Sequence, residues 1–209
     1  MRELVKVSEV WDATFTCFLH TIILWKESND FFWVEHLHQL GPDMSLDVDL
    51  ESLHAPSLLP MSLILGWWHD GLMEAPQLLP DDVFVKLPNL LDYSKDGLSL
   101  GVAMVAEAKV LETLQRHPHW NICAYFDCVQ WSDCITGLAM KRYKHTLDKA
   151  VWLNGISDST SILEAILEGV KFLHSLGFIH GDLNPFNIML DYDDTLVIVD
   201  FDVWLLDQN

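Results

Sequence analysis

The chain has 209 residues, half of them apolar, and carries 31 acidic against 12 basic side chains, a formal net charge of −19. This length suits one mid-sized domain, or a small domain with an extension, and the apolar content excludes a chain that is disordered by composition. The excess of negative charge argues against a nucleic-acid partner, because binding to the phosphate backbone needs a basic face.

The N-terminal stretch up to Trp25 is the part of the chain to test for a targeting or membrane segment. Its apolar portion, roughly Ala13 to Trp25, is too short to span a bilayer, contains His20 and is not preceded by a basic region. The four cysteines form no CxxC pair, which favours a reduced, intracellular setting. We therefore expect a soluble cytoplasmic or nuclear protein that does not associate with membranes.

Residues 1–60 are predicted to form a strand-rich extension that ends in an acidic loop. Alternating apolar residues predict two strands between residues 11 and 38, "ATFTCFLHTIIL" and "FFWVEHL". The Asp-, Ser- and Pro-rich stretch from Gly41 to about Leu59 predicts the connecting loop.

The region 61–143 is predicted to contain strands and one helix. The segment "DDVFVKLP" predicts a short strand, and "LSLGVAMVAEAKVLETLQRH" predicts a helix, because its apolar residues recur at spacings of three and four. Two further strands are predicted in "NICAYFDCV" and "CITGLAMKRY", which a polar turn joins.

The region 144–209 contains the clearest helical pattern of the chain, "STSILEAILEGVKFLHSLG". Ser157 or Asp158 is the expected N-cap of this helix, and Gly177 the expected stop. The segments "NIML" and "TLVIVDF" then predict a hairpin whose turn is the acidic "DYDD".

Two carboxylates and one amide lie around this hairpin at a spacing that suggests a site. Asn187 follows Asp182 by five residues, and Asp200 follows Asp182 by eighteen. Phosphoryl transfer from a nucleotide needs metal ions, a cation on the phosphates and a carboxylate that orients the acceptor, and magnesium prefers oxygen ligands. The spacing therefore predicts that a base, an amide ligand and a carboxylate ligand lie together at the open end of the hairpin.

These motifs, "HGDLNPFN" and "DFD", resemble the catalytic loop and the metal-binding loop of protein kinases. Upstream, "VFVK" supplies Lys86 where kinases carry a strand lysine, and Glu107 follows twenty-one residues later on the predicted helix. The stretches "RHPHWNICAYF" and "ITGLAMKRY" resemble the kinase turn, strand and hinge that come next. More narrowly, the motifs look like a family of fungal protein kinase-like proteins in which Asp-Phe-Asp commonly replaces Asp-Phe-Gly.

The resemblance covers roughly residues 80–202, and more loosely the first eighty. It implies an α+β, protein kinase-like fold, with an antiparallel-sheet small lobe that holds one helix over 61–143. An incomplete helical large lobe, containing only the catalytic and metal loops, would follow over 144–209. We expect a truncated chain, because it stops seven residues after Asp202 and lacks an activation segment.

The resemblance also implies ATP and Mg²⁺ as cofactors and transfer of the γ-phosphate to a protein Ser or Thr hydroxyl. Lys86 would hold the α/β phosphates, Glu107 would orient Lys86, and Asp182 would be the catalytic base. Asn187 and Asp200 would hold magnesium. The nucleotide pocket would be completed by Met140 at its back and by the hinge residues Lys141, Arg142 and Tyr143 along its edge.

Three departures from the kinase pattern stand out. Gly181 occupies the position of the loop arginine that meets a phosphorylated activation loop in many kinases. Asn184 occupies the position of the lysine that usually touches the γ-phosphate, which removes one cation from the transition state. No Gly-x-Gly-x-x-Gly motif precedes Lys86.

Two alternative functions stay open at this point. One is a pseudokinase or interaction module with weak or no catalysis, which the missing Gly-rich motif, Asn184 and the missing lower part of the large lobe favour. The other is a small-molecule phosphotransferase, because "HGDLNPFNIML" and "VDFD" are also similar to motifs of aminoglycoside and choline kinases. The sequence identifies neither the protein substrate nor the oligomeric state.

Several candidate residues also have structural interpretations. Lys86 can be a surface lysine and Glu107 a solvated helix charge, while Asp182 and Asn187 can cap turns; the order of the six matching motifs favours the site. The histidines and cysteines between residues 117 and 134 suggest zinc, but their spacing is unlike a zinc knuckle, so buried core thiols are expected instead.

Overall fold

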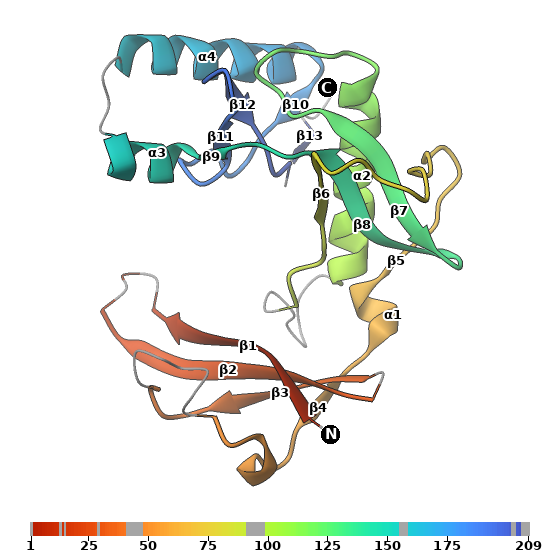
Figure 1. Ribbon diagram of the computed structural model, residues 1–209, viewed down its shortest axis with the longest axis vertical. Helices are drawn as coiled ribbons and strands as arrows, with labels where there is room; N and C mark the ends of the chain where they lie inside the picture. Colours follow the sequence, from red (N-terminus) through yellow and green to blue (C-terminus); the bar gives the residue numbers. More distant parts are fainter. Residues whose placement is uncertain are drawn as a thin grey trace. The chain divides into compact units, whose positions relative to one another are not determined.

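The structure is a computed structural model of the chain (Figure 1). It describes residues 2–12, 14, 16–28, 30–40, 48–90, 99–154 and 159–201, together with the backbone of 204–205. The predicted N-cap at Ser157 or Asp158 and the last residue of the Asp-Phe-Asp motif, Asp202, lie outside the described residues.

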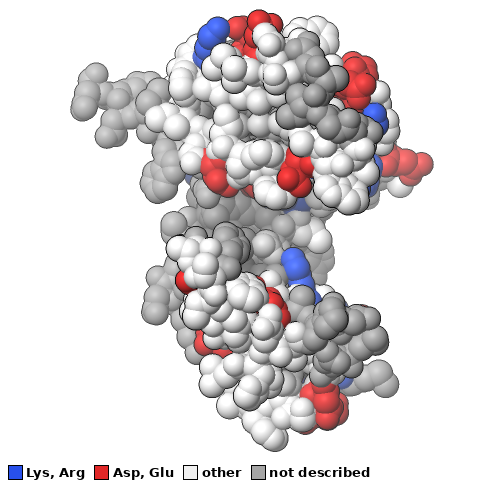
Figure 2. Space-filling model, turned by 90° about the vertical axis from the view of Figure 1, so that its left-hand side faces the viewer, with Lys and Arg blue, Asp and Glu red and all other residues white. Residues whose placement is uncertain are grey.

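Backbone contacts divide the chain into two compact units. The first unit comprises Met1–Ile64 and Asn89–Leu100, and the second comprises Leu65–Pro88 and Gly101–Asn209. The predicted division at residues 60 and 143 stays a prediction. Figure 2 shows acidic side chains scattered over the drawn face with few basic ones among them, as the net charge of −19 requires.

The first unit is built on one antiparallel sheet with the strand order β1-β2-β3-β4. Its core lies along the second strand, where Ile23, Leu24 and Trp25 are fully buried. A 3-10 turn, η1 (Leu50–Ser52), and a short helix, α1 (Met61–Ile64), flank the fourth strand. The strands are β1 (Arg2–Trp11), β2 (Phe18–Glu27), β3 (Asp30–His36) and β4 (Ser57–Leu59).

The prediction of two strands in this region is correct for β2 and β3 but misses β1 and β4. The strand β1 mixes charged and apolar residues, and none of its side chains is fully buried, so it has no clear period of two. The predicted acidic loop contains η1 and β4, which are three residues long each; its residues 41–47 lie outside the described part.

In the second unit, an antiparallel sheet packs against one long helix. The central strand β8 pairs with β7, β6 and β5. Buried residues of the helix, among them Ala108 and Leu111, share a core with Cys128 and Leu138 of the sheet. The elements are β5 (Gly66–Trp67), β6 (Val83–Lys86), α2 (Leu100–Gln115), β7 (Tyr125–Trp131) and β8 (Cys134–Lys141).

The rest of the second unit contains two helices and short strands. The clearest predicted helix is confirmed as α4, which ends before Gly177, a residue with φ of +84° that suits a helix stop. The predicted hairpin is confirmed as β11 and β12, while β9 and α3 were not predicted. The elements are β9 (His145–Thr146), α3 (Leu147–Asn154), α4 (Ser159–Ser175), β10 (Phe178–Ile179), β11 (Ile188–Leu190), β12 (Leu196–Ile198) and β13 (Trp204–Leu205).

The strand β12 connects this region to the sheet and to α2. Ile198 donates its backbone N–H to Asn121 at 2.8 Å and accepts from the N–H of Cys123 at 3.0 Å. Val197, Ile198 and Phe201 belong to the same buried core as α2 and β8. Phe201, three residues after β12, is therefore placed against α2. None of the described helices is long and apolar enough to cross a membrane.

At Gly101 the helix α2 comes close to the backbone of Leu65 and Gly66. A Cβ at this position would overlap the carbonyl group of Leu65 and lie 2.8 Å from the backbone nitrogen of Gly66. We predict that Gly101→Ala lowers the stability of the fold by about 1–3 kcal/mol through overpacking, measured by urea unfolding. Val102→Ala, at an exposed neighbouring position, should stay within about 0.5 kcal/mol of the parent; equal stability of both variants would contradict the packing.

The four cysteines provide a second test of the fold. Burial raises the pKa of Cys123 to about 12 and that of Cys128 to about 11, whereas Cys17 is exposed. Because the thiolate is the reactive form, we predict that Ellman's reagent at pH 8 labels Cys17 rapidly and reaches Cys123 and Cys128 only after unfolding. Rapid labelling of all four cysteines in the folded protein would show that the second unit lacks this core.

Candidate active site

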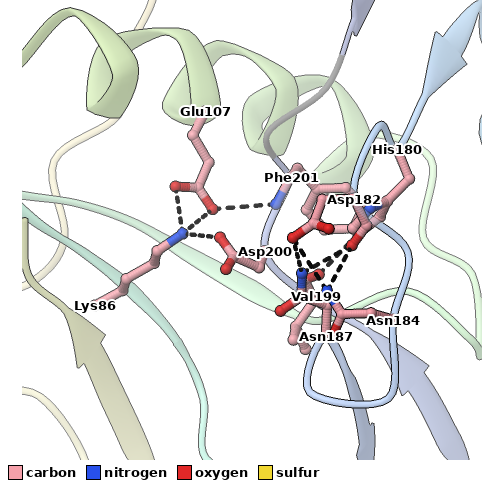
Figure 3. A network of polar contacts seen from close by, with 9 residues as sticks. All are labelled: Lys86, Glu107, His180, Asp182, Asn184, Asn187, Val199, Asp200 and Phe201. Atoms are coloured by element: carbon pink, nitrogen blue, oxygen red, sulfur yellow. Dashed lines mark hydrogen bonds and ion pairs between the residues drawn. The ribbon is translucent and has the colours of Figure 1, made fainter. Parts of the chain in front are cut away.

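A lysine and two carboxylates from distant parts of the sequence meet in the second unit (Figure 3). The Nζ atom of Lys86, at the end of β6, lies 2.7 Å from both Oε1 and Oε2 of Glu107 on α2. It also donates to Oδ1 of Asp200, which follows β12. The structure thus brings together three predicted site residues that are separated by 21 and 114 positions.

Each member of this cluster is positioned by its own element. Lys86 is held by the pairing of β6 with β8, and Glu107 lies in the buried middle of α2, beside the fully buried Ala108. The backbone N–H of Phe201 donates to Glu107 Oε1 at 3.3 Å. Asp200 has a φ of +66°, a left-handed conformation that Asp tolerates better than most residues, so the chain turns sharply just where its carboxylate meets Lys86.

The charges of Lys86, Glu107 and Asp200 influence the pKa values of Lys86 and Glu107. Burial by itself would lower the pKa of the Lys86 ammonium, but the Glu107 and Asp200 carboxylates outweigh burial and raise that pKa. Burial raises the pKa of the Glu107 carboxyl, and the ion pair with Lys86 opposes this rise. Removing one of these three side chains would leave a partly buried charge without its partner, which costs free energy. Lys86 is therefore held as a cation at the centre of the cluster.

The predicted catalytic loop is organised around Asp182. The Nδ2 atom of Asn187 donates to Asp182 Oδ2 at 3.0 Å and to its backbone carbonyl at 2.9 Å. Asn184 makes the same two contacts through its own Nδ2, at 3.1 and 3.2 Å. Both amides therefore hold one oxygen of the carboxylate that we predicted as the base.

Val199 ties this loop to the strand that carries Asp200. Its N–H donates to the carbonyl of Asn187 at 3.0 Å, and its carbonyl lies 2.9 Å from His180 Nε2. His180 is only 4% exposed, and its ring packs against Phe201. Figure 3 shows Asp200 between Lys86 on one side and the loop with Asp182 and Asn187 on the other.

His180 is a buried residue of the catalytic loop to which the sequence assigned no role. Its contact with Val199 joins residues that are 19 positions apart. The sequence signal for it was the histidine that begins the motif "HGDLNPFN". Its Nδ1 atom has no hydrogen bond within the part of the chain that the structure describes.

The predicted pocket residues of β8 and the following stretch have structural partners. Met140 is buried in the core. The Arg142 guanidinium donates to the carbonyl of Val83 at 2.8 Å, and the hydroxyl of Tyr143 accepts from the N–H of Ala124 at 2.8 Å. The Lys141 ammonium pairs with Asp191 in the β11–β12 turn. Within the described residues, no hydrogen bond or ion pair joins these four side chains to Lys86.

The zinc alternative finds no support in the geometry. Cys123 and Cys128 are buried in the core, and the ring of His119 stacks on Phe172. Among the described residues, no three His, Cys, Asp or Glu side chains are grouped so that they could hold a metal ion. A magnesium site does not need such a group, because substrate phosphates and water complete its coordination.

The residues around Asp200 fit a magnesium site of that kind. Asp200 offers a carboxylate that is 45% exposed. Since the Nδ2 atom of Asn187 donates to Asp182, the amide oxygen of Asn187 remains as an acceptor, which is the chemistry that magnesium prefers.

Comparison with known proteins identifies the family of this site. The sequence model of the protein kinase domain matches residues 90–205, a segment that contains Glu107, Asp182, Asn187 and Asp200 and begins just after Lys86. The placement of Lys86 therefore rests on its contacts with Glu107 and Asp200 rather than on that match.

Individual relatives are also kinases. A mitogen-activated protein kinase kinase kinase of Pyricularia oryzae is 30% identical over 96 residues, which are 44% of this chain and 6% of that protein. The serine/threonine-protein kinase H1 homolog of Danio rerio is 43% identical over 47 residues, 21% of this chain and 11% of that protein. A probable cell division protein kinase of Encephalitozoon cuniculi is 25% identical over 117 residues, 56% and 42% of the two chains.

The matched segments thus span less than half of each of these relatives. The described fold has the α+β character that was predicted, with antiparallel sheets and a few helices. Because the domain match covers more than half of the 209 residues, the chain belongs to the protein kinase domain family.

Proposed function

We propose that this chain binds ATP with Mg²⁺ and transfers the γ-phosphate to a Ser or Thr hydroxyl of a protein. The observation that carries the proposal is the ion cluster of Lys86, Glu107 and Asp200, joined through Val199 to the loop that holds Asp182 and Asn187. Membership of the kinase family and the serine/threonine-kinase names of relatives support the acceptor class.

Each residue has a distinct role in this proposal. The Lys86 ammonium meets the α/β phosphates, and Glu107 keeps it oriented. Asp182 orients the acceptor hydroxyl and takes its proton, which is general-base chemistry. Asn187 and Asp200 hold Mg²⁺, which when bound neutralises the phosphate charge.

The stretch from Met140 to Tyr143 completes the proposed nucleotide pocket. Met140 closes its back, and the next three residues lie along its edge. Because the side chains of Arg142 and Tyr143 have partners in the second unit, their contacts with the nucleotide base would go through the backbone.

We further assign the chain to the fungal, Asp-Phe-Asp branch of kinase-like proteins, with a small lobe over 61–143 and a partial large lobe over 144–209. The Asp-Phe-Asp at residues 200–202 and similarity to a Pyricularia oryzae kinase support this assignment. An intracellular location, cytoplasmic or nuclear, is proposed from four cysteines without a CxxC pair.

A binding module without catalysis is the second candidate function. The observation that favours it is Asn184, a neutral side chain that donates to Asp182 at 3.1 Å where many kinases carry a lysine for the γ-phosphate. Such a module would bind the nucleotide or a partner protein but would not transfer phosphate.

Nucleotide binding is tested by thermal unfolding with Mg-ATP. We predict that saturating Mg-ATP, at about 100 times its Kd, raises the melting temperature by roughly 5–10 °C, and that Asp200→Asn abolishes most of this rise. Asp194→Asn is the matched control, because Asp194 is also a carboxylate with positive φ, at 64°, but lies in the β11–β12 turn. An equal rise in the melting temperature of both variants would show that nucleotide binding does not depend on Asp200.

Catalysis is tested by phosphate transfer to a mixed Ser/Thr peptide library and, in parallel, to aminoglycosides and amino alcohols. We predict transfer to peptides, with Asp182→Asn lowering kcat by about 10²- to 10⁴-fold while the thermal shift with Mg-ATP remains. Transfer only to the small molecules would replace the protein acceptor, and binding without any transfer would favour the module.

A further inference from the structure

Asn184 and Asn187 converge on the same two oxygen atoms of Asp182. Asn184 Nδ2 lies 3.1 Å from Oδ2 and 3.2 Å from the backbone carbonyl, and Asn187 Nδ2 lies 3.0 and 2.9 Å from the same atoms. Within the described residues, the other carboxylate oxygen, Oδ1, has no hydrogen bond. The two amides thus make the oxygens of Asp182 inequivalent.

Asn184 is itself held in place at its other end. Its Oδ1 atom accepts from the N–H of Phe186 at 2.8 Å, and its backbone carbonyl accepts from the N–H of Asn187 at 3.0 Å. This is a turn closed by an asparagine side chain around Pro185. A lysine has donors but no side-chain acceptor, so it could not close this turn.

The charges around the loop show what Asn184 does not do. Figure 3 draws three carboxylates (Glu107, Asp182 and Asp200) and one ammonium (Lys86). A neutral amide adds no positive charge to this set, and its N–H is directed to Asp182 rather than away from it. Asn184 therefore contributes orientation, not charge.

We propose that Asn184 is a positioning residue that, together with Asn187, fixes Asp182 through Oδ2 and so presents Oδ1 as the proton acceptor. The inference rests on the proposed function. In the transfer step the acceptor oxygen forms a bond to the γ-phosphorus, the bond from that phosphorus to the bridging oxygen of ADP breaks, and the hydroxyl proton goes to Oδ1. Asn184 acts through Asp182 and touches no reacting atom.

Three substitutions separate positioning from charge and from the turn. Asn184→Asp keeps the side-chain acceptor for Phe186 but loses the donor, Asn184→Ala loses both, and Asn184→Lys loses the acceptor and adds a positive charge. If Asn184 positions Asp182, the two variants that lose the donor, Asn184→Asp and Asn184→Ala, both lower kcat by about tenfold, the effect of one hydrogen bond to a charged group, with KM for Mg-ATP unchanged.

Two kinetic outcomes overturn the proposal. A direct effect on the phosphates would move kcat or KM in opposite directions for Asn184→Asp and Asn184→Lys. A role limited to the turn would leave Asn184→Asp with the kcat of the parent while Asn184→Ala loses activity. Rates are measured as phosphate transfer, or as release of inorganic phosphate from ATP, with Asp194→Asn as the control for an unrelated carboxylate in the same unit.

A spectroscopic readout keeps the proposal testable even if the chain transfers no phosphate. In protein labelled with ¹⁵N at asparagine, the side-chain amide signal of Asn184, assigned by its loss in Asn184→Asp, should shift in Asp182→Ala and stay in place in Asp194→Asn. If the chemical shift of the Asn184 side-chain amide is unchanged in Asp182→Ala, the positioning role is overturned. A shift without any phosphate transfer would retain it and refute the proposed catalysis instead.

Discussion

The site depends on one interaction, the sharing of the Lys86 ammonium between Glu107 and Asp200. Charges that leave water are stabilised only when they find partners with good geometry, and Glu107 has 10% of its side chain exposed. The buried Glu107 carboxylate therefore finds its partner only when β6, which carries Lys86, and α2 are both in place, and the turn after β12 adds Asp200 to the same ammonium. The ion cluster thus joins the sheet and α2 to the turn that follows β12.

The strand β12 and the residue after it connect the ion cluster to the catalytic loop. Ile198 bonds to the backbone of Asn121 and Cys123, and the next residue, Val199, bonds to both Asn187 and His180. With Val199 held on one side and Phe201, whose N–H donates to Glu107, held on the other, Asp200 takes a left-handed backbone conformation, φ +66°, and its carboxylate meets Lys86. The positive φ is sustained by contacts on either side of the residue, as is usual where strain lies at a functional site.

How far the sequence predicted the structure depended on the range of the interaction concerned. The long helices α2 and α4 were predicted because their apolar spacing is a local signal. The meeting of Lys86, Glu107 and Asp200 followed from the order of motifs, although 114 positions separate the first from the last. The short elements β4 and β9 were missed, because two or three residues carry no period. The clamp of Asn184 on Asp182 and the contact of His180 with Val199 were missed, because side-chain direction is set by tertiary packing.

The same charges explain why a metal belongs to the proposed function. Among the residues that Figure 3 draws, Glu107, Asp182 and Asp200 carry carboxylates and Lys86 carries the ammonium, and a nucleotide would add further negative charge to them. Like charges at close range disfavour ionisation and binding, and Asn184 is neutral, so the loop supplies no second cation of its own. In the proposed function, a divalent cation on Asn187 and Asp200 would offset this repulsion and leave the pair of Lys86 and Glu107 in place. The nucleotide and the metal would then favour each other's binding, because each would reduce the electrostatic cost of the other.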